Sequence, residues 1–150
     1  MQYGQHLLWC IDVWENEPNI NLEVLKNCQI ATPHIAGHTL QSKLKGLELI
    51  YDAAVKLKFI SPSKNTFTYP TQTLSFENQS VSWQEVFLKI FNPLILTQQL
   101  KENLLKGNNV FDKLRKEFKR MEVSATVIEN IKLKSQDLTF LNNLGIKFLN

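Results

Sequence analysis

The sequence predicts an α/β protein in which a short parallel sheet precedes a mostly helical half. Two kinds of pattern carry this prediction. Short apolar runs at residues 7–12 and 29–32 suit strands that are buried on both faces, as in a parallel sheet. Apolar residues over 39–59, and again over 110–121, recur at three- and four-residue steps, which is the spacing of amphipathic helices.

Loop-forming residues set the boundaries of the elements in the first half. Pro18 and the asparagines beside it predict a turn after the first strand, and a short helix is expected over 20–26. Pro33 ends the second strand, and Gly37 marks a tight loop. Thr39 is well placed to cap the long helix that follows, because its hydroxyl can accept from the first backbone N–H groups.

Residues 61–80 are polar and marked by prolines, so they predict a linker with a short extended piece around 74–76. Ser82 and Glu85 have the spacing of a capping box at the start of the next helix. Pro93 separates that helix from another, which Gly107 closes. The last elements are expected to form a small strand–helix–strand unit at 124–128, 135–143 and 146–149.

The composition excludes several functional classes. A net charge of +3 is too small and too dispersed to indicate nucleic-acid or membrane binding. No apolar run approaches the ~20 residues of a membrane-spanning helix, and the first six residues hold no Lys or Arg, so we expect neither a span nor a signal peptide. Cys10 and Cys28 do not make a disulfide framework, and we expect free, buried thiols in the cytoplasm.

Three polar features follow the predicted strands and are expected to face one crevice. These are Asp12, the Glu17–Pro18 pair and the loop that carries His34. A histidine with a carboxylate partner is a proton-transfer pair, because the carboxylate fixes the tautomer and stabilises the imidazolium. The spacing of His34 and His38 does not indicate a metal site, since Pro33 and Gly37 exclude a shared helix face.

The order of residues in this segment is a more specific indicator of function than any one of its residues. Ile11-Asp-Val-Trp-Glu-Asn-Glu-Pro18, followed by Ala31-Thr-Pro-His-Ile-Ala-Gly-His-Thr39, resembles the signature of the D-2-hydroxyacid dehydrogenases. The helix Asn21-Leu-Glu-Val-Leu-Lys26 and Lys43-Leu-Lys-Gly46 are similar to the 4-phosphoerythronate dehydrogenase branch of that family. The second half, with Phe111-Asp-Lys-Leu-Arg-Lys116, Phe118 and Arg120, resembles the start of the C-terminal dimerisation domain of that branch.

The resemblance implies a role for each matching residue. His34 would be the general acid/base and Glu17 its carboxylate partner, while Asp12 and Gly37 would contact NAD. His38 stands where the family commonly has a tyrosine that touches the substrate, a phosphorylated hydroxy acid. In the full enzyme, the family reaction is the NAD-dependent oxidation of 4-phosphoerythronate to its 2-oxo acid in vitamin B6 (pyridoxine) biosynthesis.

The resemblance also implies an organisation. Residues 1–60 would be the end of a partial Rossmann-type NAD-binding and catalytic domain, 61–80 a linker and 81–150 a small α/β domain that forms a homodimer. The family also needs a Gly-rich phosphate-binding loop and an upstream substrate arginine, and this chain has no GxGxxG and only Arg115 and Arg120. We therefore expect a truncated gene product, a gene fragment or one half of a split enzyme, with no dehydrogenase activity by itself.

Two alternatives remain beside the hypothesis that the chain is part of an enzyme. In the first, residues 81–150 act only as a dimerisation or interaction module. In the second, the basic residues of the helix at 110–121 bind nucleic acid, although interleaved acidic residues favour a solvated helix face. We also expect the first half to be poorly stable alone, because the strands at 7–12 and 29–32 would expose faces and edges.

Overall fold

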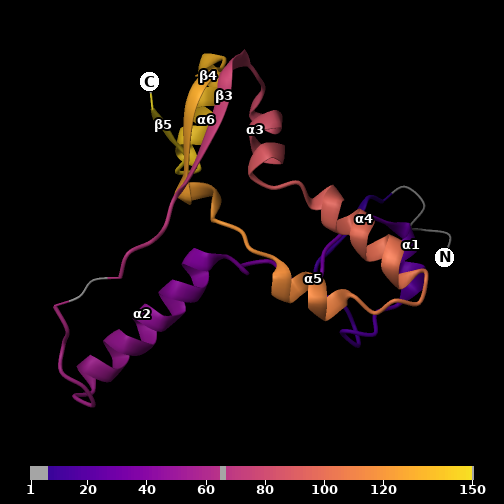
Figure 1. The fold of residues 1–150 in the computed structure, drawn as a ribbon, viewed down its shortest axis with the longest axis horizontal. Coiled ribbons are helices and arrows are strands. Elements are labelled where there is room, and N and C mark those ends of the chain that lie inside the picture. The colour runs from indigo at the N-terminus through magenta and orange to yellow at the C-terminus, as the bar shows by residue number, and fades with distance from the viewer. Residues whose placement is uncertain (1–6, 65–66, 150) are drawn as a thin grey trace. The chain divides into compact units, whose positions relative to one another are not determined.

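The computed structural model describes residues 7–64 and 67–149; the first six residues, and with them the expectation about a signal peptide, lie outside this range. Figure 1 shows the elements in chain order. They are β1 (Trp9–Ile11), α1 (Leu22–Asn27), β2 (Cys28–Ala31), α2 (Leu40–Lys56), β3 (Gln72–Ser80), α3 (Trp83–Ile90), α4 (Pro93–Leu104), α5 (Phe111–Glu117), η1 (Val123–Ala125), β4 (Thr126–Lys132), α6 (Ser135–Asn143) and β5 (Lys147–Leu149).

Two compact units make up the described residues, and the chain passes from one unit to the other three times. The first unit combines the residues up to Ala36 with Phe91–Phe118. The second combines Gly37–Ile90 with the residues from Lys119 onward. The first unit is therefore discontinuous: part of the second half of the sequence folds with the segment that carries the candidate acid/base pair.

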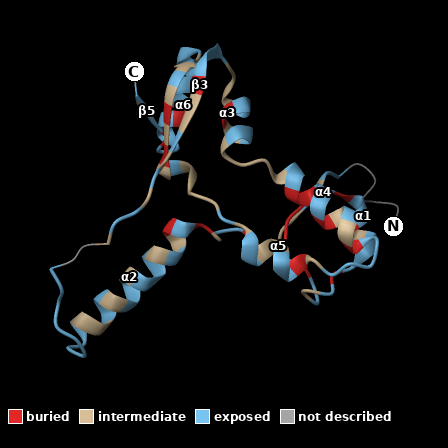
Figure 2. Ribbon diagram, in the orientation of Figure 1, coloured by how far each residue is buried: buried red, intermediate tan, exposed pale blue. Residues whose placement is uncertain are grey.

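In the first unit, β1 and β2 pair in parallel and α4 packs on β2. The apolar face of α4 and the side chains of α1 and β2 form one core with Trp14 and Phe111. Figure 2 shows the buried stretch of α4 in red. The hydroxyl of Thr97 accepts from the N–H of Ala31 at 2.9 Å, which ties the helix to the last residue of β2. The second half of the sequence thus covers the short sheet.

In the second unit, three parallel strands lie in the order β3-β4-β5, with α3 and α6 contacting each other beside them. Its core contains five buried apolar residues, Phe76, Val86, Ile128, Leu141 and Ile146. The long helix α2 begins at the Thr39 cap, whose hydroxyl accepts from the N–H of Ser42 at 3.0 Å. Gln41 is the buried residue of α2 within the described part of the chain.

The predicted fold class is confirmed: the protein is α/β, with two small parallel sheets and six helices among the described residues. Several local predictions are confirmed as well. Thr39 caps α2, and α6 spans the predicted residues 135–143. Ser82 and Glu85 form the capping box, in which the Glu85 carboxylate accepts from the N–H of Ser82 at 2.7 Å. None of the described helices is long and apolar enough to cross a membrane.

The segment at 61–80 differs from the linker interpretation in its second half. Residues 72–80 form β3, the longest described strand, and only a few of its positions around 74–76 face the core. Most of the side chains of β3 are polar, and those of its last four residues are exposed. That composition is also the composition of a linker, so the strand left little apolar signal.

Three further local predictions are wrong in detail. The helix expected over 110–121 ends at Glu117, because Phe118 adopts an extended backbone and its ring packs against Phe91. The strand expected over 124–128 begins with the 3-10 turn η1 and continues to Lys132. Cys10 is exposed, because it points away from the core at the middle of β1, whereas Cys28 is buried as expected.

Candidate functional site

The candidate acid/base residues lie just after two parallel strands of the first unit. Because β1 and β2 are parallel, their carboxyl ends meet at one edge of the sheet. Asp12 directly follows β1, and Thr32 directly follows β2. The Thr32 hydroxyl donates to Asp12 Oδ1 at 2.6 Å, so the two strand ends are joined by their side chains.

Glu17 and His34 form a close pair. His34 Nδ1 lies 2.9 Å from Glu17 Oε2, and the His34 and Glu17 side chains keep 38% and 20% of their exposure. Glu17 Oε1 accepts from the backbone N–H of Trp14 at 2.8 Å, which orients the carboxylate. The Nε2 atom of His34 has no hydrogen bond to any residue within 7–64 or 67–149, so it is the atom that remains for a proton transfer.

The charge of Glu17 is set by opposing effects. Partial burial raises its pKa, but the hydrogen bond from the Trp14 N–H, the hydrogen bond and charge of His34 and the charge of Arg115 together lower the pKa below the ordinary value of 4.5. Glu17 is therefore a carboxylate near neutral pH, and it can only accept a hydrogen bond. It follows that Nδ1 of His34 carries the proton of this contact and that Nε2 of the neutral ring holds a lone pair.

Asp12 organises the loop that carries His34. Its Oδ1 accepts from the Ile35 N–H and its Oδ2 from the Ala36 N–H, each at 2.8 Å, in addition to the Thr32 hydroxyl. Its backbone carbonyl accepts from the His34 N–H, also at 2.8 Å. The predicted contact of Asp12 with NAD stays a prediction, and the structure gives this carboxylate three donors from its own chain.

His34 has an uncommon backbone conformation. Its φ is +53°, in the left-handed region that non-glycine residues rarely occupy because of contacts with Cβ. Such a conformation persists only where the surrounding contacts hold it, and it is often found at functional sites. Here the hydrogen bonds centred on Asp12 supply part of the hold. The loop therefore presents the imidazole from a backbone that is fixed on its N-terminal side by β1.

Gly37 and His38, the other two predicted site residues, belong to the second unit. Gly37 has a φ of +69°, and nothing lies within 4 Å of the place where a Cβ would be. His38 Nε2 lies 3.0 Å from the Lys43 ammonium. The structure thus gathers Asp12, Glu17 and His34 in one place, and the roles of Gly37 and His38 stay predictions.

Two residues of this site were given no role from the sequence. The Trp14 indole donates to the Thr32 carbonyl at 2.9 Å and its backbone N–H binds Glu17, so this residue joins the two loops. Arg115 Nε donates to the His34 carbonyl at 3.1 Å from a position 81 residues further along the chain. Trp14 lies within the motif that carried the resemblance, whereas no local pattern connects Arg115 to His34.

The residues of the first unit do not fit a whole NAD molecule. The pyrophosphate needs free N–H groups at a helix that follows a strand. At the helix α1, the N–H groups of Glu23 and Val24 both donate to the Asn21 cap. No group of three or more His, Cys, Asp or Glu side chains in the described ranges could hold a metal ion. Helix α1 therefore does not offer these two N–H groups to a pyrophosphate.

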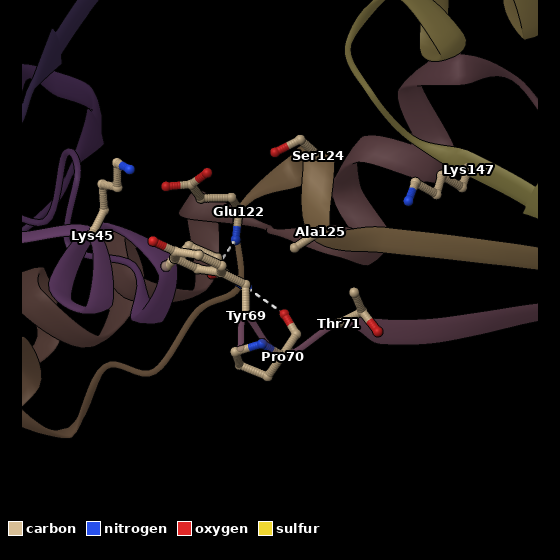
Figure 3. Close-up of a pocket in the computed structure, with 9 residues that line it drawn as sticks. Lys45, Tyr69, Pro70, Thr71, Glu122, Ser124, Ala125 and Lys147 are labelled. Carbon is tan, nitrogen blue, oxygen red and sulfur yellow. Dashed lines mark hydrogen bonds between the residues drawn. The ribbon is translucent and has the colours of Figure 1, made fainter. Parts of the chain in front are cut away.

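A cavity of about 440 Å³ lies in the second unit (Figure 3). Gln41 is one of its lining residues. Its amide donates to the Pro70 carbonyl at 2.7 Å, and its side-chain oxygen accepts from the Glu122 N–H at 3.0 Å. The lysines Lys45 and Lys147 lie on opposite sides of the cavity. None of the five predicted site residues lines it.

Comparisons with known proteins agree on one family. No family model matches the chain. A Coxiella burnetii protein named erythronate-4-phosphate dehydrogenase is 37% identical over 125 residues, which is 80% of this chain and 34% of that protein. A protein of the same name from Pseudoalteromonas translucida is 34% identical over all of this chain and 41% of its own length. Another from Legionella pneumophila is 31% identical over 67% of this chain and 28% of its own length.

The chain spans less than half of the length of each of these relatives. Their name describes the enzyme expected from the segments around His34 and Phe111, since erythronate 4-phosphate and 4-phosphoerythronate are the same compound. The similarity is spread over most of the chain and recurs in three bacteria. The chain is therefore homologous to the erythronate-4-phosphate dehydrogenases, and its matches are consistent with a C-terminal portion of such a protein.

Proposed function

We propose that the first unit supplies the acid/base pair for the NAD-dependent oxidation of 4-phosphoerythronate to its 2-oxo acid, a cytoplasmic step of vitamin B6 biosynthesis. The observation that carries the proposal is the 2.9 Å contact between His34 Nδ1 and Glu17 Oε2 in a chain homologous to erythronate-4-phosphate dehydrogenases. The family reaction removes a proton from an alcohol, and a histidine with an ionised carboxylate partner is suited to that task.

The proton step follows from the tautomer of His34. Glu17 accepts from Nδ1–H, so the lone pair on Nε2 can take the proton of the substrate hydroxyl as the carbonyl forms. The resulting imidazolium is stabilised by the Glu17 carboxylate, whose lowered pKa keeps it charged. In the reverse direction, the same Nε2–H donates to the carbonyl oxygen. Acceptance of the matching hydride is the chemistry that NAD supplies when it is bound.

This chain alone is proposed to be inactive. Its five glycines form no GxGxxG, and both of its arginines follow the acid/base segment. A correctly oriented His34 cannot replace the positioning of cofactor and substrate, which supplies a large share of catalytic rate. Purified chain with NAD and 4-phosphoerythronate should give no NADH above background, and clear NADH production would contradict this part of the proposal.

A chimera tests the acid/base assignment directly. The portion of the Pseudoalteromonas translucida relative that precedes its match would be joined to this chain, and NADH formation measured. We expect an active chimera in which His34→Asn lowers kcat by roughly 10²–10⁴-fold, the usual contribution of a general base. Glu23→Gln, at an exposed carboxylate of α1, is the matched control and should leave kcat unchanged. An H34N chimera with full activity would refute the assignment.

We also propose that residues 81–150 contribute to a homodimer, and a specific observation favours this. Four large apolar residues on α3 and α6 or just after them remain 38–47% exposed: Leu88, Leu138, Phe140 and Leu144. Helices α3 and α6 contact each other, and exposed apolar residues on neighbouring elements are a common feature of protein interfaces. Because α4 and α5 belong to the first unit, the interface is proposed on α3 and α6. Sedimentation at several concentrations tests it, and a strictly monomeric chain would rule it out.

A further inference from the structure

Arg115 contacts the acid/base loop from the second half of the sequence. Its Nε donates to the His34 carbonyl at 3.1 Å, and its side chain is half-buried. It lies on α5, which is anchored in the first unit by the buried ring of Phe111 and by Leu114. The short helix therefore has a fixed place on the core from which Arg115 reaches the loop.

Arg115 and Asp12 bind the two ends of one peptide group. The peptide between His34 and Ile35 has its carbonyl bound by Arg115 and its N–H bound by Asp12 Oδ1 at 2.8 Å. Both partners carry charge, and hydrogen bonds to charged groups are stronger than those between neutral groups. With its carbonyl and N–H both held, this peptide cannot rotate about the bond that links it to the His34 Cα.

The restraint on this peptide acts directly beside His34, whose backbone is in the left-handed conformation. The His34 N–H is held by the Asp12 carbonyl on one side of Cα, and Arg115 holds the peptide on the other. Together they maintain the left-handed conformation and so set the direction of the Cα–Cβ bond. This direction brings Nδ1 to Glu17. The charge of Arg115 also contributes to the lowered pKa of Glu17.

We propose that Arg115 is a positioning residue for the His34–Glu17 pair: its guanidinium holds the His34 carbonyl and thereby keeps Nδ1 of the imidazole on the Glu17 carboxylate. The proposal rests on the proposed function only for the catalytic use of the pair, because the hydrogen bonds that position the pair do not involve substrate. It differs from the role of a substrate-binding arginine, since the contact is to the backbone of the chain. The acid/base pair is thus completed by a residue outside the segment that the resemblance assigns to it.

The test reads the tautomer of His34 in the whole chain by ¹⁵N NMR, in the alkaline range where histidine rings are neutral. The signal is assigned by its absence in His34→Asn. The wild-type ring should be in the Nδ1–H form. Arg115→Met removes the charge and the hydrogen bond, and we expect loss of the Nδ1–H form in favour of a mixture of tautomers. Lys116→Met, which removes a neighbouring exposed charge from the same helix, should keep the wild-type signal.

Arg115→Gln separates the hydrogen bond from the charge. The amide nitrogen of Gln lies the same number of bonds from Cα as Nε of Arg, so it can donate to the same carbonyl. We expect R115Q to restore the Nδ1–H form. A wild-type signal in R115M, or a mixture in R115Q equal to that in R115M, would overturn the proposal.

The folded state of each variant is read from the methyl signals of the buried Leu25 and Leu100. If R115M loses them, Arg115→Ala replaces it with the same expected and overturning results. Because the tautomer is measured without NAD or substrate, an inactive chimera would count against the proposed function and leave this result standing.

Discussion

Helices α4 and α2 both carry apolar residues at three- and four-residue steps, but their surroundings differ. Helix α4 buries Leu96, Thr97, Leu100 and Leu104 against β2 and α1. Helix α2 is longer, yet Leu47, Leu49 and Ile50 are 57–70% exposed. In Figure 2, red recurs along α4, whereas most of α2 is tan and blue. The spacing of apolar residues along a helix therefore does not show whether the described residues cover its apolar face.

The two helices contribute unequally to the stability of this chain. Burial of apolar surface is the main favourable contribution to folding. Helix α4 buries three leucines, whereas the buried residue of α2 among the described residues is Gln41. Substitutions on α4 should therefore lower the free energy of unfolding much more than equivalent substitutions on α2. Three substitutions on α4 and α2 test this contrast, and a fourth, at Glu17, compares a residue of the candidate site with them.

The largest effect is expected for Leu100→Ala on α4. Leu100 is fully buried in the core of the first unit, so truncation leaves a cavity as well as losing apolar burial. The expected loss is about 2–5 kcal/mol in the free energy of unfolding. Urea unfolding followed by circular dichroism measures it. A loss below that of the exposed Ile50→Ala on α2 would mean that α4 is not the stable cover of the sheet.

A smaller effect is expected for Thr97→Val. The Thr97 hydroxyl accepts from the Ala31 N–H, and Ala31 is fully buried, so valine leaves that N–H without its partner. An unpaired buried donor costs about 1–3 kcal/mol. Amide hydrogen exchange at Ala31 should become faster. The control is Thr139→Val on α6, whose hydroxyl bond to the Ser135 carbonyl is exposed and whose loss should matter little.

The effect of Glu17→Gln should depend on pH. The folded-state pKa of Glu17 lies below its ordinary value of 4.5, so ionisation stabilises the folded state. The stability difference between wild type and E17Q is fully present above pH 4.5. It declines as the pH falls further and is lost once the pH is below the folded-state pKa. We expect it to be smaller than the effect of Thr97→Val because Glu17 keeps 20% of its exposure.

Unfolding curves of both proteins between pH 3 and pH 7 provide the measurement for Glu17. The matched control is Glu23→Gln, whose carboxylate pairs with Lys26 on the exposed face of α1. Exposed pairs of this kind contribute little, so this curve should follow that of wild type. A difference for E17Q that grows toward acid would contradict the assigned direction.

The smallest effect is expected for Ile50→Lys on α2. Ile50 is 70% exposed, and lysine is a good helix former, so the change should alter the free energy of unfolding by no more than about 0.5 kcal/mol. Urea unfolding again measures it. A loss comparable with that of Leu100→Ala would show that α2 is covered in solution, and it would remove the contrast between the two helices.

The elements that the sequence predicted well have strong local signals. The Thr39 cap, the Ser82–Glu85 capping box and the helix at 135–143 depend on residues within one or two turns of each other. The elements that were missed depend on distant partners. Strand β3 is mostly polar and is formed by its pairing with the distant strand β4, and Phe118 leaves the helix because it packs against Phe91. Such tertiary contacts cannot be seen in a short window of sequence.

The candidate site also has features that the sequence predicted and features that depend on distant contacts. The pairing of Glu17 with His34 could be expected, because both follow predicted parallel strands and match one motif. The position of Asp12 was also expected, but its hydrogen bonds to the loop were not. Arg115 could not be found, since no pattern in the sequence links α5 to the loop around His34. Finding it required knowing that Phe91–Phe118 folds with the beginning of the chain.

The discontinuity of the first unit has a consequence for how the protein is made. On the ribosome, β1, β2 and the loop with His34 emerge before Gly37–Ile90, and the helices that cover them emerge afterwards. At about 5–20 residues per second, the nascent sheet waits several seconds for α4 and α5. During this interval Leu25 and Ala31 lack their partners from the second half. The early segment therefore completes its core only after the residues up to Phe118 have emerged from the ribosome.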